Sequence, residues 1–184
     1  MTVMTSSMPR IFRRFGRDRR GVSAVEFAFI APLMIGLYLG CTEISDGVAA
    51  DRKVSLTAGA LANLASQVTT ISTAEMTNLL DASGAIIAPY DASKLAMTVT
   101  CLNIDANKNA NVKWSVPRNG AAKSGMLTIP AALAVPNTQL IYSEVTYAYT
   151  PIIGYTISGT LTLSDHMYMS PRLAPPNYNG TPCT

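Results

Sequence analysis

The sequence has 184 residues, of which 48% are hydrophobic and 14% are charged, and its formal net charge is +3. A chain of this length has room for one ordinary domain, which excludes a multidomain enzyme. The high apolar and low charged fractions also exclude an intrinsically disordered protein, because such a chain must bury apolar surface.

Positive charge is concentrated in the first 21 residues. Six arginines and one aspartate lie there, whereas eight basic and ten acidic residues follow. The six are Arg10, Arg13, Arg14, Arg17, Arg19 and Arg20. A nucleic-acid-binding arm would need a basic folded face or interleaved aromatic residues, and neither follows in the sequence. We therefore expect no nucleic-acid partner.

An apolar segment follows this basic region directly. Residues 22–41 contain a single charged residue, Glu26, and a helix of about 20 residues spans about 30 Å, the thickness of a bilayer's hydrocarbon core. The alternative is a buried core helix, which is unusual next to six arginines. Because the arginines precede the segment and acidic residues follow it, the positive-inside rule predicts a cytoplasmic N-terminus and an exported C-terminal part.

Three familiar kinds of N-terminal processing fit this region imperfectly. A secretory signal peptide would be cut before Asp51, after three small or apolar residues. A lipoprotein signal would end at Cys41, although Tyr38 stands where leucine is expected. A twin-arginine signal would use Arg13 and Arg14, but its apolar region is usually less hydrophobic than this one.

A fourth kind of processing also accounts for Glu26. An unpaired carboxylate within the membrane costs roughly 2.5 to 3.5 kcal/mol on insertion scales, so it usually has a partner. Cleavage between Gly21 and Val22 would create an α-amino group at Val22. That amine, or the amine of a neighbouring subunit, would neutralise Glu26 within the apolar layer. Type IV pilins have this arrangement.

The segment 19–27 resembles the prepilin peptidase site of class III signal peptides, and in particular that of TadE-like minor pseudopilins of the tight adherence (Flp) type IVb pilus system. Gly21 corresponds to the residue before the cut and Val22 to the new N-terminus. Glu26 and Phe27 correspond to the acidic–aromatic pair typical of the family. Further similarities lie in residues 31–33, 146–151 and 169–183.

The resemblance implies a minor pilin that takes part in pilus assembly. Residues 1–21 would be a basic cytoplasmic leader, residues 22–42 a transmembrane helix and residues 43–184 an exported periplasmic domain. The protein would lie in the bacterial inner membrane or in the pilus. Its partners would be the prepilin peptidase, other pilus subunits, inner-membrane pilus assembly proteins and the lipid bilayer. The alternative is a signal-anchored periplasmic binding or envelope-associated module that keeps its leader.

The helical pattern continues beyond the membrane segment. Apolar residues recur at spacings of three and four from Val54 to Ile71, which predicts a helix of roughly 45 residues that begins in the membrane. Gly47 and Gly59 each weaken this helix by about 1 kcal/mol relative to alanine, so we expect a bend near one of them. The apolar stripe would pack on the protein's own sheet or against other pilus subunits.

The remainder of the chain predicts a short helix and a sheet. Ser72 and Glu75 have the spacing of a capping box, which predicts a helix to about Leu80. Turn-rich residues separate the following alternating segments into two hairpins. The four predicted strands are near 95–101, 112–116, 139–150 and 155–169. We therefore expect a pilin-like α+β fold, in which the long N-terminal helix packs on one face of a small, about four-stranded antiparallel sheet.

Alternation within the first hairpin assigns side chains to faces of the sheet. Leu95, Met97, Val99 and Cys101 are predicted to share one face. In the second strand, Val112, Trp114 and Val116 form a matching apolar run. The opposite face is predicted to be solvated, and residues 115–136, rich in proline and glycine, are predicted to form an irregular insert.

Two of the three cysteines, Cys101 and Cys183, belong to the predicted exported domain. This compartment is oxidising, which favours a disulfide between them. Such a bond would tether the tail 172–184 to the first strand of the sheet and would stabilise the domain by roughly 4 kcal/mol on the chain-entropy model. The alternative is a reduced core cysteine at 101 and a free thiol at 183.

Catalytic motifs are absent from the sequence. His166 is the single histidine, and no cluster of histidine, cysteine and aspartate has metal-ligand spacing. The chain also lacks a nucleophile elbow, a P-loop and a dinucleotide-binding glycine motif. We therefore expect a protein that is not an enzyme, with no cofactor, metal or small-molecule substrate.

Overall fold

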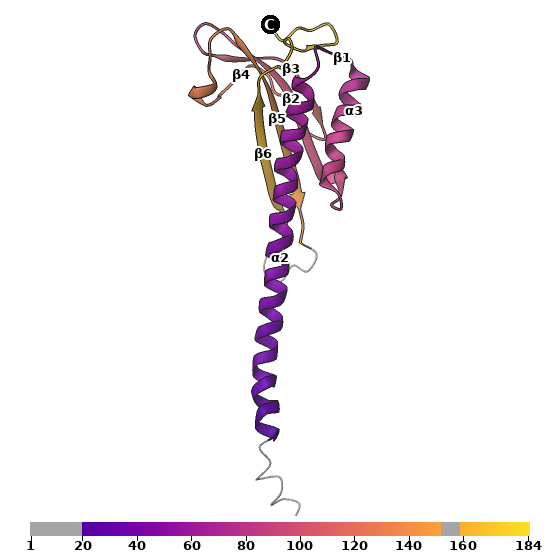
Figure 1. Ribbon diagram of the computed structural model, residues 1–184, viewed down its shortest axis with the longest axis vertical. Coiled ribbons are helices and arrows are strands. Elements are labelled where there is room, and N and C mark those ends of the chain that lie inside the picture. The colour runs from indigo at the N-terminus through magenta and orange to yellow at the C-terminus, as the bar shows by residue number, and fades with distance from the viewer. Residues whose placement is uncertain (1–19, 152–158) are drawn as a thin grey trace, which may run out of the picture. The chain divides into compact units, whose positions relative to one another are not determined.

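A computed structural model describes residues 20–151 and 159–184 (Figure 1). The chain divides into two compact units, residues 1–42 and residues 43–184. The first unit, where it is described, consists of the N-terminal part of helix α2. The second contains the rest of α2 and all the other elements. The predicted leader, apart from its last two residues, lies outside the described residues.

Helix α2 (Arg20–Ser66) is 47 residues long, close to the predicted length. It remains helical through Pro32, Gly47 and Gly59, so the glycines do not interrupt it. Within the second unit one face of α2 is fully buried. The buried residues include Ala50, Val54, Ala58, Leu61 and Ala65. These residues recur at spacings of three and four, and they pack on the protein's own sheet, the first of the two expected uses of the stripe.

Five strands form one antiparallel sheet in the order β4-β3-β2-β5-β6. They are β2 (Leu95–Ile104), β3 (Ala110–Arg118), β4 (Met126–Leu127), β5 (Thr138–Tyr149) and β6 (Leu161–Met169). The four long strands are the predicted ones, and the two-residue β4 adds a fifth. The first residues of the fourth predicted strand, including Tyr155, lie outside the described residues.

Helix α3 (Thr73–Gly84) covers the sheet beside α2 and starts at the predicted capping box. The Ser72 hydroxyl accepts a hydrogen bond from the Glu75 main-chain N–H at 3.3 Å, and the Glu75 carboxylate accepts one from the Ser72 N–H at 2.8 Å. The helix runs four residues beyond Leu80, where it was predicted to end. Asp81 of α3 pairs with Arg118 of β3, which joins the helix to the sheet.

A β-bulge corrects one side-chain prediction. Cys101 pairs with Trp114 but Leu102 pairs with Val112, so Lys113 is an extra residue in β3. The bulge moves Val112 to the opposite face of the sheet from Trp114. Trp114 and Val116 join the core against α2, whereas Val112 packs in a second cluster.

The face of the sheet opposite α2 is partly covered, although this face was predicted to be solvated. The second cluster consists of Leu102, Ile104, Ala110, Leu140 and Tyr142. Leu127 of β4 and Leu133 of the short 3-10 helix η3 (Ala131–Leu133) pack against it. Both belong to the irregular insert, which begins only after Arg118 because β3 is longer than predicted. Two further 3-10 turns, η1 (Ala85–Ile87) and η2 (Ala92–Lys94), connect α3 to β2.

A two-stranded parallel sheet joins distant parts of the chain. Strand β1 (Thr70–Ile71) follows α2 directly, and β7 (Asn177–Tyr178) lies in the C-terminal tail. Neither was predicted, because a two-residue strand has no recognisable periodicity. The pairing places the tail at the end of the core where α2 finishes and α3 begins.

Candidate functional site

The residues predicted to form the processing site lie in the first two turns of α2. Gly21, Val22, Glu26 and Phe27 are all exposed. Among the described residues, no atom outside the helix's own nearby backbone lies within 4 Å of where a Gly21 side chain would begin. Glycine has a low helix propensity, so Gly21 weakens the first turn of α2.

The helical geometry relates Val22 to Glu26 in a specific way. Residues four apart lie on the same face of a helix, one turn from each other. If the chain began at Val22, its α-amino group would lie beside the Glu26 carboxylate. Glu26 would also be close to the positive end of the helix dipole, which stabilises a negative charge. One helical turn therefore separates Val22 from Glu26.

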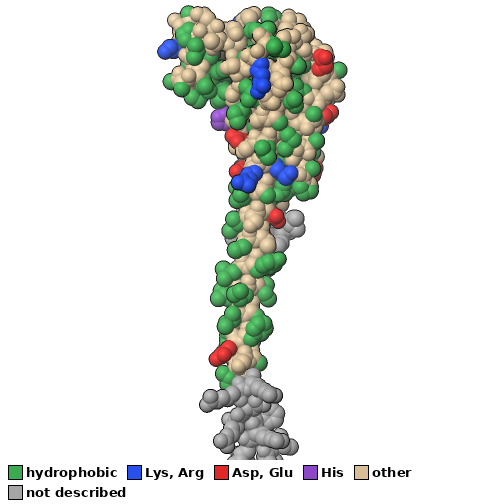
Figure 2. Space-filling model, viewed as in Figure 1, with side chains coloured by type: hydrophobic (Ala, Val, Ile, Leu, Met, Phe, Trp, Pro, Cys, Tyr) green, Lys and Arg blue, Asp and Glu red, His purple; other side chains and the backbone are tan. Residues whose placement is uncertain are grey.

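The apolar surface of α2 in the first unit is unburied. Apart from Leu39, which is partly buried, its large apolar side chains are more than half exposed, up to 78% for Phe29. They are Val22, Val25, Phe27, Phe29, Ile30, Leu33, Met34, Ile35, Leu37 and Tyr38. Figure 2 shows hydrophobic side chains in groups along this part of the helix.

This helix is long and apolar enough to cross a membrane. A window with a mean hydropathy of 1.9 lies within Gly21–Ser66, and none of that window is buried. A core helix of a soluble protein would be mostly covered by its own domain, so this finding argues against that alternative. So much exposed apolar surface needs lipid or another apolar partner around it.

In the second unit, the first turns of α2 are fixed by aromatic and carbonyl contacts. The Tyr90 hydroxyl donates to the Asp46 carbonyl at 3.0 Å. The Tyr90 ring lies 6.1 Å from that of Tyr147 and 6.3 Å from that of Tyr149. Burial raises the pKa of all three phenols. Lys53 donates to two carbonyls of the segment after α3, which holds this segment against α2.

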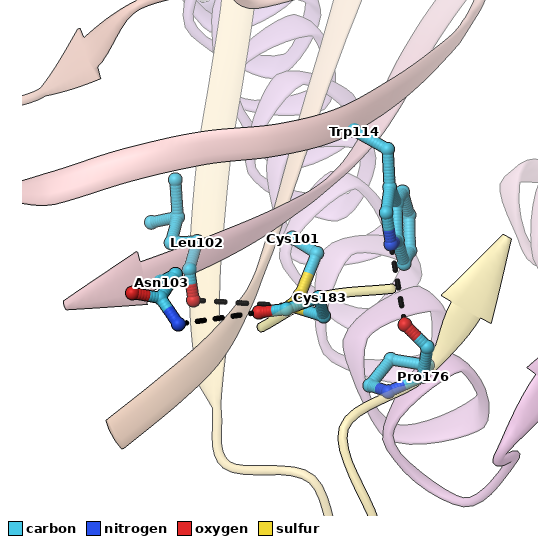
Figure 3. Close-up of a disulfide and its surroundings, with 6 residues drawn as sticks. All are labelled: Cys101, Leu102, Asn103, Trp114, Pro176 and Cys183. Carbon is cyan, nitrogen blue, oxygen red and sulfur yellow. Dashed lines mark hydrogen bonds between the residues drawn. A yellow bond between two sulfur atoms is a disulfide. The ribbon is translucent and has the colours of Figure 1, made fainter. Parts of the chain in front are cut away.

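Cys101 and Cys183 are joined by a disulfide, as the preferred interpretation of the sequence expected (Figure 3). Their Cα atoms are 5.9 Å apart, and both side chains are completely buried. Beside the bond, the Trp114 indole N–H donates to the Pro176 carbonyl at 3.2 Å. The Asn103 amide donates to the Cys183 carbonyl at 3.5 Å. The tail is thus attached to β2 and β3 by covalent and polar contacts.

A tight turn positions the end of the tail. Asn179 and Gly180 both have positive φ angles, 47° and 83°, and the Thr181 N–H donates to the Tyr178 carbonyl at 2.8 Å. Asn-Gly is the preferred pair for such a turn, so this dipeptide is a signal for the turn in the sequence. The Asn179 amide also donates to the Thr73 hydroxyl at 2.6 Å, which joins the turn to α3.

An aromatic group lies on the sheet face opposite α2. The rings of Tyr142, His166 and Tyr168 contact one another, with centroids 5.0 to 5.8 Å apart. Glu144 lies beside them and pairs with Lys123 at 2.6 Å. Among residues 20–151 and 159–184, no group of three or more histidine, cysteine, aspartate or glutamate side chains is arranged to hold a metal. His166 therefore lies in an aromatic setting on the sheet.

Comparison with known proteins finds a similarity in the N-terminal part of the chain. Residues 21–62 match the family model described as TadE-like protein. A search of curated proteins and a search of solved structures each gave no match. The family match begins at Gly21, the residue before the predicted cut, and ends within the buried part of α2. Residues 21–62 are therefore similar to the TadE-like family, as the resemblance around Gly21 implied.

Proposed function

We propose that this protein is a minor pilin, or pseudopilin, that takes part in assembly of a tight adherence pilus and is not an enzyme. The observation that carries the proposal is the TadE-like match, which covers the exposed apolar helix and starts at Gly21. The TadE-like family supports a role associated with this pilus and with its subunits. The protein would act through contacts of its helix and its α+β domain.

Processing by a prepilin peptidase is the first step of this proposal. The enzyme would cut between Gly21 and Val22, and the basic leader would remain in the cytoplasm. Residues 22–42 would cross the inner membrane and the domain from residue 43 would lie in the periplasm. The exposure of residues Gly21 and Val22 and the one-turn spacing of Val22 and Glu26 support this cut.

Intact mass measurement with N-terminal sequencing tests the cut. The full chain is purified from membranes of its native host. A mature chain that begins at Val22 is expected. A chain that begins at Met1 or Asp51, or that carries lipid on Cys41, would contradict prepilin processing and favour an anchor, a secreted domain or a lipoprotein.

A substitution at Glu26 separates the minor pilin from a signal-anchored periplasmic module. Glu26→Ala removes the carboxylate that would pair with the new α-amino group, so we expect loss of pilus assembly while membrane insertion is retained. Ser23→Ala, in the same turn, is the matched control and should assemble normally. Normal assembly by Glu26→Ala would contradict the proposal. The TadE-like match does not favour the signal-anchored module.

A further inference from the structure

The two edges of the five-stranded sheet differ in how they are protected. At one edge, β4 pairs with β3, the Val112 N–H donates to the Gly125 carbonyl at 2.8 Å, and Pro117 lacks an N–H altogether. At the other edge lies β6, nine residues long, which contains neither proline nor lysine. Long unprotected edges readily add a further strand.

The strand registers show which main-chain groups of β6 are open. The Ile104 carbonyl accepts from the Asn137 N–H at 2.9 Å, and Ile104 pairs with Thr138 at the start of β5, so the main chain of Ile104 faces β5. Because successive residues of a strand direct their N–H and C=O groups to opposite sides, these groups of the even-numbered residues of β2 face β5. Those of the odd-numbered residues of β5 then face β6, and those of the even-numbered residues of β6 point away from the sheet.

A separate contact agrees with this alternation. The His166 N–H donates to the Asp165 carboxylate at 2.7 Å, and not to β5. Within the described chain, the other outward main-chain groups of β6 have no main-chain partner. These groups belong to Thr162, Ser164 and Tyr168. The Asp165 carboxylate thus accepts from one of the outward N–H groups of β6, and the other outward groups remain open.

Apolar side chains accompany the open edge on its α2 side. Leu161 and Met167 are 43% and 39% exposed. Both lie on the same side of β6, and Met167 reaches to within 4.0 Å of where a side chain on Gly59 of α2 would begin. A strand added to β6 would cover these two side chains while its main chain bonded to the open row.

We propose that the β6 edge binds an extended strand of a different pilus subunit. The open row specifies the chemistry of the partner, which must present unpaired N–H and C=O groups in a β conformation. Identity as another pilus subunit rests on the proposed function, because that function places the domain among such subunits.

Strand direction argues against a second copy of this chain as the partner. Met167 lies beside Gly59, and the Ser66 hydroxyl donates to the Met169 sulfur at 3.4 Å, so β6 and this part of α2 run in the same direction (Figure 1). Two identical edges that pair about a two-fold axis are antiparallel. Residues 43–66 of α2 would then run in opposite directions in the two copies, which does not fit the shared membrane anchor of the proposed function.

Photo-crosslinking in the native host tests this proposal. The full chain carries p-benzoylphenylalanine at Thr162, which is exposed on the outward row. We expect a crosslinked peptide from an extended segment of another pilus subunit. Ser164→Pro removes an outward N–H that β5 does not use, and should lower the adduct yield about fivefold or more. Ser164→Ala keeps the N–H and should leave the yield unchanged.

The fold of each variant is checked by its non-reduced mass and unfolding midpoint, and Ser164→Lys replaces the proline variant if that variant does not fold. An adduct formed only with a second copy, an equal yield in both Ser164 variants, or no adduct would overturn the proposal. N-terminal sequencing of the same samples separates the two conclusions. If the mature chain begins at Val22 but no adduct forms, the proposal of a docking edge is wrong and the proposal of a minor pilin still stands.

Discussion

At the scale of single residues, Tyr142 illustrates how position in the sheet sets side-chain chemistry. Burial, followed by the nearby charge of Glu144, raises its pKa from 10.0 to about 12. The folded protein thus favours the neutral phenol. Its stabilising contribution is fully present below pH 10, and it is lost as the pH rises towards about 12.

A pH titration of the phenols checks this assignment. In the folded full chain, ultraviolet absorbance should show a phenolate component near pH 12 that disappears in Tyr142→Phe. The variant should also lose less unfolding free energy than the native chain over this alkaline range. An unchanged absorbance titration in Tyr142→Phe would assign the component to another tyrosine.

A buried hydroxyl links the sheet to α2. The Ser143 hydroxyl donates to the Ala58 carbonyl at 2.7 Å, and both residues are completely buried. We expect Ser143→Ala to lower the unfolding free energy by about 1 kcal/mol, because a buried hydrogen bond is lost. Thr77→Ala removes an exposed hydroxyl that bonds the Thr73 carbonyl and is the matched control, with a smaller effect. Chemical denaturation of the full chain in detergent measures both.

At the scale of elements, the capping box makes α3 sensitive to acid. The main-chain N–H and hydroxyl of Ser72 lower the pKa of Glu75 from its ordinary 4.5, so this contribution is present above that pH and is lost as the pH falls through the lowered value. Ser72→Ala should cost about 1 kcal/mol near neutral pH and less in acid. Denaturation of both chains at two pH values checks this, and a constant difference would contradict the role of Glu75.

Elements with a local periodic pattern were predictable, and those that depend on distant contacts were not. The long helix and the four main strands follow from spacings that can be counted in the sequence. The bulge at Lys113 has no such signal, because register depends on how β2 and β3 meet. The pairing of Thr70 with Asn177 likewise depends on contacts between the two ends of the domain.

The candidate sites divide in the same way. The Gly21 to Phe27 segment was predicted as a processing site because its pattern is contiguous in the sequence. The open row of β6 was not, because whether a strand lies at an edge depends on the order of all five strands. A sequence of alternating residues reads the same in a central strand and in an edge strand.

At the scale of the whole molecule, the disulfide fixes the tail across the end of the core. It joins residues separated by 82 positions, and β7 and Asn179 extend the attachment to β1 and α3. Constraining so long a loop in the unfolded chain stabilises the fold by about 4 kcal/mol on the chain-entropy model. Cys183→Ala should therefore lower the unfolding free energy by about that amount and should increase amide exchange in β1 and the first turn of α3. Cys41→Ala, which changes an exposed cysteine outside the disulfide, should have a much smaller effect on both measurements. Equal stability of the two variants would mean that the buried and polar contacts of the tail are sufficient without the covalent bond.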